Sequence, residues 1–105
     1  MIARLWRGAA ADRRNADAYV RHLRTNVVPE LAAIPGYREV RLMRREEGER
    51  TEFLVMTLWD SMDAIRRFAG ENPERAVVEP EARAVLSSFD DFVRHFELAH
   101  AAPCT

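Results

Sequence analysis

The run from residue 53 to residue 59 constrains the fold more than any other part of the sequence, because Thr57 is its only polar residue. In an extended strand, successive side chains point to opposite faces. One face of this strand therefore carries Leu54, Met56 and Leu58, and the other carries Phe53, Val55 and Trp59. A strand with one face in water alternates apolar and polar residues, so this run predicts a strand that is covered on both faces.

The rest of the chain predicts a small α+β domain around that strand. Periodicity and turn signals favour a strand over residues 2–8, a helix over 15–34, strands over 37–46 and 51–59, helices over 62–71 and 80–86, and a strand over 89–98. This order predicts a ferredoxin-like βαββαβ fold, in which a four-stranded antiparallel sheet carries its helices on one face. We expect a single domain over residues 1–99 and a C-terminal tail over residues 100–105.

Capping and turn residues indicate where the predicted helices begin and bend. Asn15 or Asp12 can cap the first helix, because their side chains accept bonds from the free N–H groups of a first turn. Pro29 is expected to kink this helix, because proline has no backbone N–H. The Asn-Pro pair at residues 72–73 predicts a further short turn that runs through Val78.

The predicted helices can cover only one face of the sheet. The other apolar face would expose a patch larger than ordinary monomers carry, so packing against a second copy of the sheet is the simplest solution. The alternative is that the segment from Ala99 onward folds back over the sheet, but this segment carries little apolar bulk. We therefore expect an obligate homodimer that forms through the sheet face.

Composition and charge exclude several classes of partner. The apolar and charged fractions, 48% and 31%, are those of a globular protein, and no apolar run is long enough to span a membrane. All 16 basic residues are arginines interleaved with acids, and the net charge is −1, so we expect no nucleic-acid partner. The N-terminus lacks a signal-peptide segment and Cys104 has no partner cysteine, which favours a cytoplasmic protein without a disulfide.

Five stretches along the chain resemble the antibiotic biosynthesis monooxygenase family of the dimeric α+β barrel superfamily. These stretches are Arg4–Gly8, Pro29–Gly36, Glu52–Ser61, Ala64–Gly70 and His95–Glu97. The resemblance implies the dimeric fold described above. It implies less about the reaction, because the family contains cofactor-free oxygenases that act on phenols and quinols, haem-degrading enzymes, and members without an assigned activity.

The haem-degrading branch of that family shares three features that can be sought in this sequence. They are an asparagine on the first strand, a tryptophan on the helix after the third strand, and a histidine farther along that helical region. Residues 62–88 contain neither tryptophan nor histidine, and no asparagine precedes Asn15. We therefore expect no haem turnover of that type and no cofactor, while haem binding without degradation stays a third possibility.

Cofactor-free oxygenation needs a group that accepts a proton from the substrate inside a dry cavity. Histidine is the natural acceptor near neutral pH. We take His95 as the candidate catalytic residue, because it lies inside a predicted strand, whereas His22 lies on the first helix and His100 in the tail. The alternative is that His95 is a structural residue bound to a carboxylate or to the backbone.

The candidate substrate-binding residues are aromatic and basic: Arg4, Trp6, Arg7, Trp59, Phe68 and Phe92. The tryptophans can form the flat wall of an aromatic pocket, the arginines can hold a phenolate or a carboxylate, and the phenylalanines can line a cavity between helices and sheet. The alternatives are core or interface positions for the aromatic residues and surface ion pairs for the arginines.

The sequence therefore favours a cofactor-independent, monooxygenase-like homodimer that acts on a small aromatic or polyketide-like molecule, such as a phenol or quinol. A non-catalytic protein of the same fold, which binds a small molecule or serves a stress-related role, is the alternative. His95 lacks the second histidine and the carboxylate of a non-haem iron site, so we expect no metal.

Overall fold

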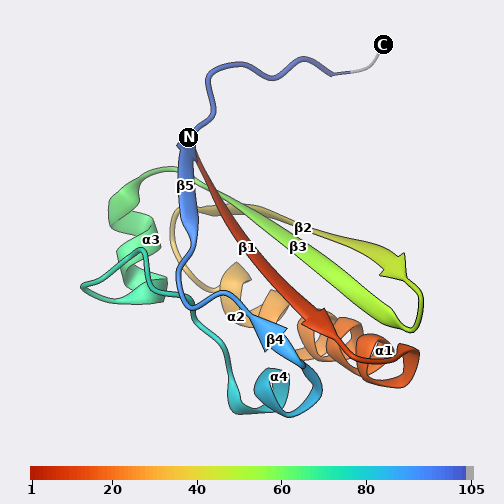
Figure 1. Ribbon diagram of the computed structural model, residues 1–105. Helices are drawn as coiled ribbons and strands as arrows, with labels where there is room; N and C mark the ends of the chain where they lie inside the picture. The colour runs from red at the N-terminus through yellow and green to blue at the C-terminus, as the bar shows by residue number, and fades with distance from the viewer. Residues whose placement is uncertain (104–105) are drawn as a thin grey trace.

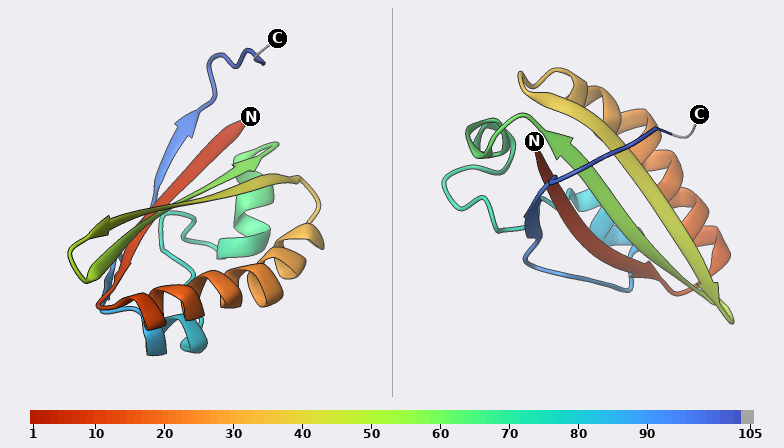
Figure 2. Two further views of the ribbon diagram at one scale, coloured as in Figure 1. Left: turned by 90° about the vertical axis from the view of Figure 1, so that its right-hand side faces the viewer. Right: turned by 90° about the horizontal axis from the view of Figure 1, so that it is seen from above.

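The computed structural model describes residues 1–103, and it consists of one antiparallel sheet with its helices on one side (Figures 1 and 2). Its elements are β1 (Ile2–Ala10), α1 (Arg13–His22), the π-helical turn η1 (Leu23–Val27), α2 (Val28–Ala32), β2 (Tyr37–Glu47), β3 (Arg50–Trp59), α3 (Met62–Ala69), α4 (Pro80–Val85), β4 (Ser88–Phe89) and β5 (Arg94–Glu97). The strand order is β2-β3-β1-β4, and β5 also pairs with β1. This arrangement confirms the predicted α+β class and the ferredoxin-like order.

Within residues 1–103, no helix is long and apolar enough to cross a membrane. The cysteine predicted to be unpaired, Cys104, lies outside the described residues.

Elements α1, η1 and α2 follow one another without a break and are called the long helix below (Figure 2). Asp12 caps its first turn, because the Asp12 side chain accepts a bond from the Asn15 N–H at 2.8 Å. In η1, the Val28 N–H donates to the Leu23 carbonyl, which makes the turn one residue wider than an α-helical turn. This wide turn lies directly before Pro29, whose ring would clash with a carbonyl of a regular α-helix. Where the sequence predicts a kink at Pro29, the structure has a π-helical turn that ends before this residue.

The last predicted strand, over residues 89–98, is wrong as a continuous strand, because the chain leaves β1 between β4 and β5. There it pairs with the segment before α4. The Val93 N–H donates to the Glu74 carbonyl at 2.7 Å, and the Ala76 N–H donates to the Asp91 carbonyl at 2.8 Å. These long-range bonds break the strand in two.

The same pairing limits the turn predicted from the Asn-Pro pair. One turn forms, closed by the Arg75 N–H, which donates to the Asn72 carbonyl at 3.2 Å. The predicted continuation through Val78 is wrong, because the chain is already extended at Ala76, where it bonds to the segment between β4 and β5.

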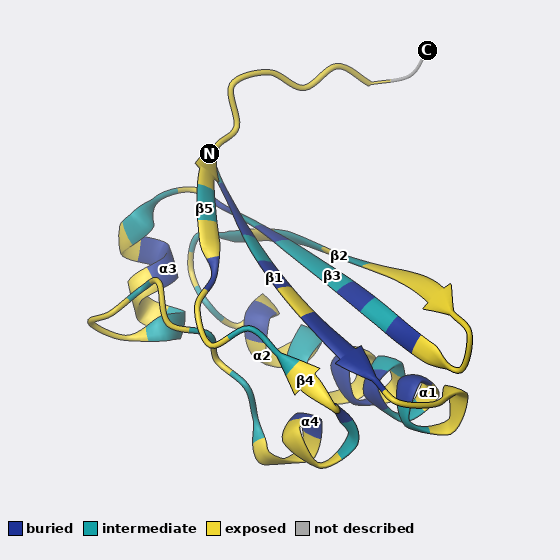
Figure 3. Cartoon of the chain, in the orientation of Figure 1, coloured by how far each residue is buried: buried dark blue, intermediate teal, exposed yellow. Residues whose placement is uncertain are grey.

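The register of β1 and β3 separates the two faces of the sheet. Arg4 lies beside Thr57 and Trp6 lies beside Val55 on the face that the helices cover. The side chains at the centre of the core on this face form two groups, Trp6, Tyr19 and Phe53 in one and Leu31, Trp59 and Ile65 in the other. Figure 3 shows this buried face between β1, β3 and the helices.

The opposite face of the sheet is the second apolar face that the sequence predicts, and it is called the open face below. Leu5 lies beside Met56 on the open face. Met43 on β2 and Phe96 on β5 extend it and are 43% and 44% exposed. Residues 99–103 are exposed and run past the end of β5, away from the sheet (Figure 1). Within the described residues, the alternative in which the C-terminal segment covers this face is therefore wrong.

Candidate functional site

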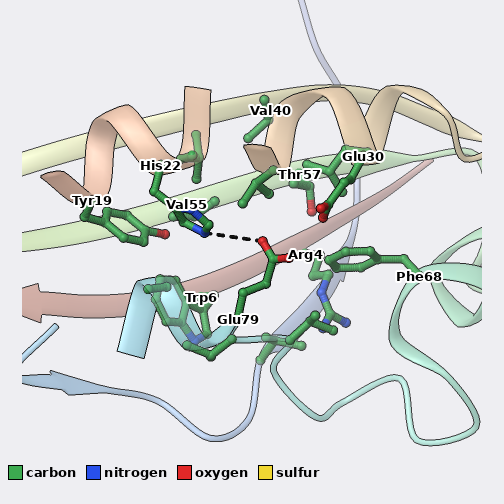
Figure 4. A pocket seen from close by; sticks show the side chains of 17 residues that line it. Arg4, Trp6, Tyr19, His22, Glu30, Val40, Val55, Thr57, Phe68 and Glu79 are labelled. Carbon is green, nitrogen blue, oxygen red and sulfur yellow. Dashed lines mark ion pairs between the residues drawn. The ribbon is translucent and has the colours of Figure 1, made fainter. Parts of the chain in front are cut away.

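A cavity of about 80 Å³ lies between the sheet and the long helix (Figure 4). Its wall is mostly apolar and comes from β1, β2, β3, the long helix, α3, α4, the segment that leads into α4 and the segment between β4 and β5. The polar side chains in this wall are Arg4, Tyr19, His22, Glu30, Thr57 and Glu79. Three of the predicted site residues also line it, namely Arg4, Trp6 and Phe68.

Arg4 is a buried arginine on β1, with only 5% of its surface exposed. Its Nη1 donates to the Pro73 carbonyl and, over 3.0 Å, to Nε2 of His95. Its Nη2 donates to the Arg75 carbonyl at 2.9 Å. These bonds use three of the guanidinium N–H groups and leave the others without an acceptor among residues 1–103.

The charge of Arg4 is not paired with any carboxylate of the described residues. Burial lowers the pKa of Arg4 to about 10, so the guanidinium stays charged at neutral pH. The Phe68 ring lies against it, with the ring centre 5.7 Å from Cζ. A buried cation is costly unless an anion or several hydrogen bonds compensate it. This end of the cavity therefore favours an anionic ligand.

His95 lies directly across from Arg4, on the neighbouring strand β5. Because a guanidinium only donates, Nε2 of His95 accepts this bond and the neutral ring carries its proton on Nδ1. Burial and then the Arg4 charge lower the pKa of His95, and Glu74 opposes that shift. His95 is not part of the cavity wall, and its contact with the cavity runs through Arg4.

Trp6 and Phe68 give the cavity two aromatic walls from opposite sides. The Trp6 ring is fixed, because its Nε1 donates to the Asp90 carbonyl at 2.8 Å. Trp59 does not line the cavity; it is fully buried behind Phe68, and the two rings stack with their centres 5.6 Å apart. Its Nε1 donates to the Thr57 hydroxyl at 2.8 Å. Trp59 therefore supports the aromatic wall from the core.

Arg7 and Phe92 lie away from the cavity. Arg7 is three residues from Arg4, so the alternation of the strand turns it to the open face, where it pairs with Asp90 at 3.3 Å. Phe92 is 56% exposed and packs against the guanidinium of Arg75, 5.8 Å from the ring centre. The structure therefore brings four of the predicted site residues together, Arg4 with Trp6, Phe68 and His95, and leaves these two apart.

The helix side of the cavity carries polar residues that the sequence reasoning missed, above all His22 and Glu79. The signal for His22 was present, because it lies one turn after Tyr19 and next to Leu23 on the apolar stripe of the long helix. Glu79 gave no signal, because it precedes α4 in an irregular segment. Figure 4 shows His22 and Glu79 meeting at the cavity.

His22 and Glu79 are 3.3 Å apart, from Nε2 to Oε1. Only 8% of the His22 side chain is exposed, and neither of these two atoms makes an aligned hydrogen bond within the described residues. On the other side of the ring, the Asn26 amide nitrogen lies 3.3 Å from Nδ1. Burial and then Glu30 raise the pKa of Glu79, with a smaller rise from Glu81 and an opposing effect of His22. Among residues 1–103, no three His, Cys, Asp or Glu side chains are grouped to hold a metal ion.

Comparisons with solved structures find the same fold in proteins of low sequence identity. A putative antibiotic biosynthesis monooxygenase from Bacillus cereus has a TM-score of 0.67 at 10% identity, covering 100% of this chain and 97% of the other. SnoaB from Streptomyces nogalater, a cofactor-independent oxygenase, has a TM-score of 0.65 at 17% identity, covering 97% and 96%. A point mutant of MhuD with two manganese protoporphyrin IX molecules per active site has a TM-score of 0.62 at 20% identity, covering 99% and 100%.

At these identities, the structural likeness shows a shared fold. No curated protein matches the chain significantly. The family model for antibiotic biosynthesis monooxygenase matches residues 9–85, which run from the end of β1 to the end of α4. The chain therefore belongs to the antibiotic biosynthesis monooxygenase family.

Proposed function

We propose that this protein is a cofactor-independent monooxygenase that binds a small hydroxylated aromatic molecule as its anion. The observation that carries the proposal is Arg4, a buried cation in the wall of an aromatic cavity with no carboxylate partner among the described residues. An anionic oxygen of the ligand would supply the missing counter-charge and accept the free N–H groups of the guanidinium. Membership of the family and the structural likeness to SnoaB, a cofactor-independent oxygenase, support the same class of reaction.

The proposed chemistry relies on the substrate itself as the source of electrons. Loss of a proton from a phenol or quinol gives an electron-rich anion, which can reduce O2 without a resident cofactor. When a ring C–H position becomes a carbonyl, one oxygen atom of O2 enters the ring and the other leaves as water, so the atoms balance. Arg4 would hold the anion, and the flat walls of Trp6 and Phe68 would hold the ring and exclude water.

The volume of the cavity limits the substrate to one ring at most. At about 80 Å³, it is smaller than an engineered apolar cavity of about 150 Å³ that binds benzene, so even a single ring requires the wall to widen. A polycyclic, polyketide-like ligand would require the segment that leads into α4 to move, and Val77 of that segment is 45% exposed. A porphyrin does not fit, since pockets for much smaller, drug-sized ligands already have about 300–1,000 Å³.

His95 has a positioning role in this proposal. Its Nε2 already accepts a bond from Arg4, so it holds the guanidinium in place instead of facing the ligand. We propose further that the protein acts as a homodimer through the open face, where Leu5 and Met56 are only half-buried and Phe96 is exposed.

Oxygen uptake with a panel of mono- and dihydroxylated single-ring aromatics tests the proposed function. The wild type is expected to consume O2 with at least one member. Arg4→Gln should weaken binding by at least about tenfold, because it removes a charge-assisted hydrogen bond. Arg7→Gln is the matched control on the same strand and should behave as wild type. His95→Ala should weaken binding less than Arg4→Gln.

Ligand binding, followed through tryptophan fluorescence, distinguishes the oxygenase from the non-catalytic binding protein. Binding without oxygen uptake for every compound would replace the oxygenase by the non-catalytic binding protein. If no aromatic compound binds, or if Arg4→Gln binds as well as wild type, the proposed site is wrong.

A further inference from the structure

The helix side of the cavity holds a group of polar residues that the proposed function has not used. This group, called the acid–histidine cluster below, consists of Tyr19, His22, Glu30 and Glu79. Tyr19, His22 and Glu30 come from the long helix, and Glu79 comes from the residue that precedes α4. Polar groups in an otherwise apolar cavity are expected to be paired with one another, but several of these are not.

His22 is held in one tautomer by its neighbour on the helix. The Asn26 amide nitrogen faces Nδ1 at 3.3 Å and can only donate, so Nδ1 accepts and the neutral ring carries its proton on Nε2. This Nε2 faces Oε1 of Glu79 at 3.3 Å without an aligned hydrogen bond. The ring is therefore close enough to stabilise the carboxylate and is not locked to it.

Glu79 is the group in the cavity that is best suited to take up a proton. It faces Glu30 and His22 from the long helix, and Glu81 lies two residues farther along the chain. Burial and the two neighbouring carboxylates favour the neutral acid and raise the pKa of Glu79, while His22 favours the carboxylate. A carboxyl group whose pKa moves toward neutral pH can act as a general base for a phenol.

Tyr19 supplies a donor beside this pair. It is 5% exposed, and none of the described residues forms a hydrogen bond with its hydroxyl. Burial raises the pKa of Tyr19, so the group stays a neutral O–H donor at neutral pH. It lies one turn before His22 on the same helix, and Figure 4 shows both side chains directed into the cavity.

We propose that Glu79 is the proton acceptor of the cavity, with His22 positioning its carboxylate and Tyr19 donating a hydrogen bond to the ligand oxygen. The proposal rests on the proposed function, because it assumes that the ligand is a phenol or quinol. In the step, the ligand O–H bond breaks, its proton goes to Oε1 of Glu79, and its electron pair stays on the ligand oxygen. Glu79 becomes neutral. The new anion therefore faces the protonated Glu79 and the donors of Tyr19 and His22 instead of a carboxylate.

His95, the histidine first expected to accept this proton, is placed less well. Its Nε2 is occupied by Arg4, and it does not line the cavity. Protonating His95 would also put a second positive charge beside a buried guanidinium. The acid–histidine cluster has neither obstacle.

Proton uptake on binding tests this assignment without relying on turnover. The probe is 4-nitrophenol at a pH above its own pKa, where it is an anion in solution and its absorbance reports the ionised form. If Glu79 is the acceptor, binding this anion should draw about one proton per ligand from solution, because two adjacent anions are unfavourable. Titration calorimetry in buffers of different ionisation heat measures that number.

Three variants locate the proton. Glu79→Gln should bind 4-nitrophenolate and take up no proton. Glu81→Gln, the matched control two residues farther along the chain and outside the cavity wall, should take up the proton as wild type does. If Glu79→Gln still takes up a proton and His22→Asn does not, His22 is the acceptor and the assignment to Glu79 is overturned.

The remaining outcomes separate this inference from the proposed function. Binding of 4-nitrophenolate without proton uptake by the wild type overturns the inference and leaves the aromatic site in place. Proton uptake by the wild type, lost in Glu79→Gln, together with no oxygen uptake for any phenol, supports the acceptor and overturns the oxygenase. Failure of the wild type to bind 4-nitrophenolate overturns the inference, and the proposed function is overturned with it only if no member of the aromatic panel binds.

Discussion

The guanidinium of Arg4 donates to Nε2 of His95 over 3.0 Å, between directly opposed positions of β1 and β5. Both side chains belong to the face of the sheet that the helices cover. Because Arg4 is charged and has no carboxylate partner among residues 1–103, His95 can occupy this position only as a neutral acceptor. The protonation state of one residue is thus linked to the position of the other.

This link predicts that the protein loses stability when His95 is protonated. The pKa of His95 is lowered from 6.5 in the folded state, so the unfolded chain binds the proton first as the pH falls. The stabilisation is complete above pH 6.5 and is lost as the pH falls through the folded pKa. Urea unfolding at a series of pH values from 8 to 5 should show a falling free energy of unfolding.

His95→Gln isolates the contribution of this histidine, because a glutamine carbonyl can accept the Arg4 bond and does not titrate in this range. The variant should lose part of the pH dependence. His100→Gln, in the exposed segment after β5, should keep all of it. An identical pH profile for His95→Gln and wild type would show that the link does not exist.

A second prediction compares two arginines of β1 with opposite surroundings. Arg4→Lys should destabilise the fold by about 1–3 kcal/mol, because an ammonium cannot reach the acceptors on Pro73, Arg75 and His95 together. Arg7→Lys should change the free energy of unfolding by less than about 0.5 kcal/mol, because 67% of the Arg7 side chain is exposed.

Chemical denaturation of both variants at pH 7.5 checks this difference. The outcome that contradicts it is an equal loss of stability for Arg4→Lys and Arg7→Lys. Equal values would mean that the hydrogen bonds of Arg4 add nothing that a lysine cannot replace.

The sequence was sufficient for the fold because the fold depends on local patterns. The apolar run of β3 predicts a strand with two covered faces, and Asp12 and Pro29 mark the beginning and the irregular turn of the long helix. Pairing between segments far apart in the sequence could not be predicted from such local patterns. The break between β4 and β5 arises because Val93 bonds to Glu74, and no local pattern of either residue indicates that contact.

The same distinction explains which site residues could be found. Arg4 and Arg7 are three residues apart on one strand, and alternate residues of a strand point to opposite faces. The sequence therefore does predict that these two side chains lie on different faces of the sheet. Which side holds the cavity depends on where the helices pack. Glu79 could not be found, because its meeting with His22 depends on the path of an irregular segment that has no periodicity.

A third prediction concerns the open face and the proposed homodimer. Met56→Glu would place a carboxylate at the centre of that face, between Leu5 and Arg41. It should raise the dimer dissociation constant by at least about tenfold, because burying a charge in an apolar interface is costly. Ala101→Glu, which adds the same charge in the exposed tail, should leave the dimer intact.

Sedimentation velocity over a micromolar concentration series measures both variants against the wild type. Circular dichroism must show the same fold for all three proteins. A wild type that sediments as a folded monomer at these concentrations would remove the basis for the homodimer.

The last prediction tests how α3, the helix that carries Phe68 to the cavity, is seated on the sheet. Gly36 has φ +94°, and a Cβ added there would lie 2.5 Å from the Cβ of Ala64 on α3. Gly48 in the β2–β3 hairpin has φ +62°, and a Cβ there would meet no atom within 4 Å. Both positions carry the backbone penalty of a positive φ, about 1–2 kcal/mol for an alanine.

Only Gly36→Ala adds a collision, and the Ala64 Cβ cannot rotate away from it. We therefore expect Gly36→Ala to destabilise the protein by about 1–3 kcal/mol more than Gly48→Ala. Ala64→Gly removes the other methyl group, so the double variant should recover most of that excess when thermal unfolding is measured as a double-mutant cycle. If the double variant recovers none of this stability, the extra loss in Gly36→Ala comes from the backbone at residue 36. The close contact between this loop and α3 is then not what positions Phe68.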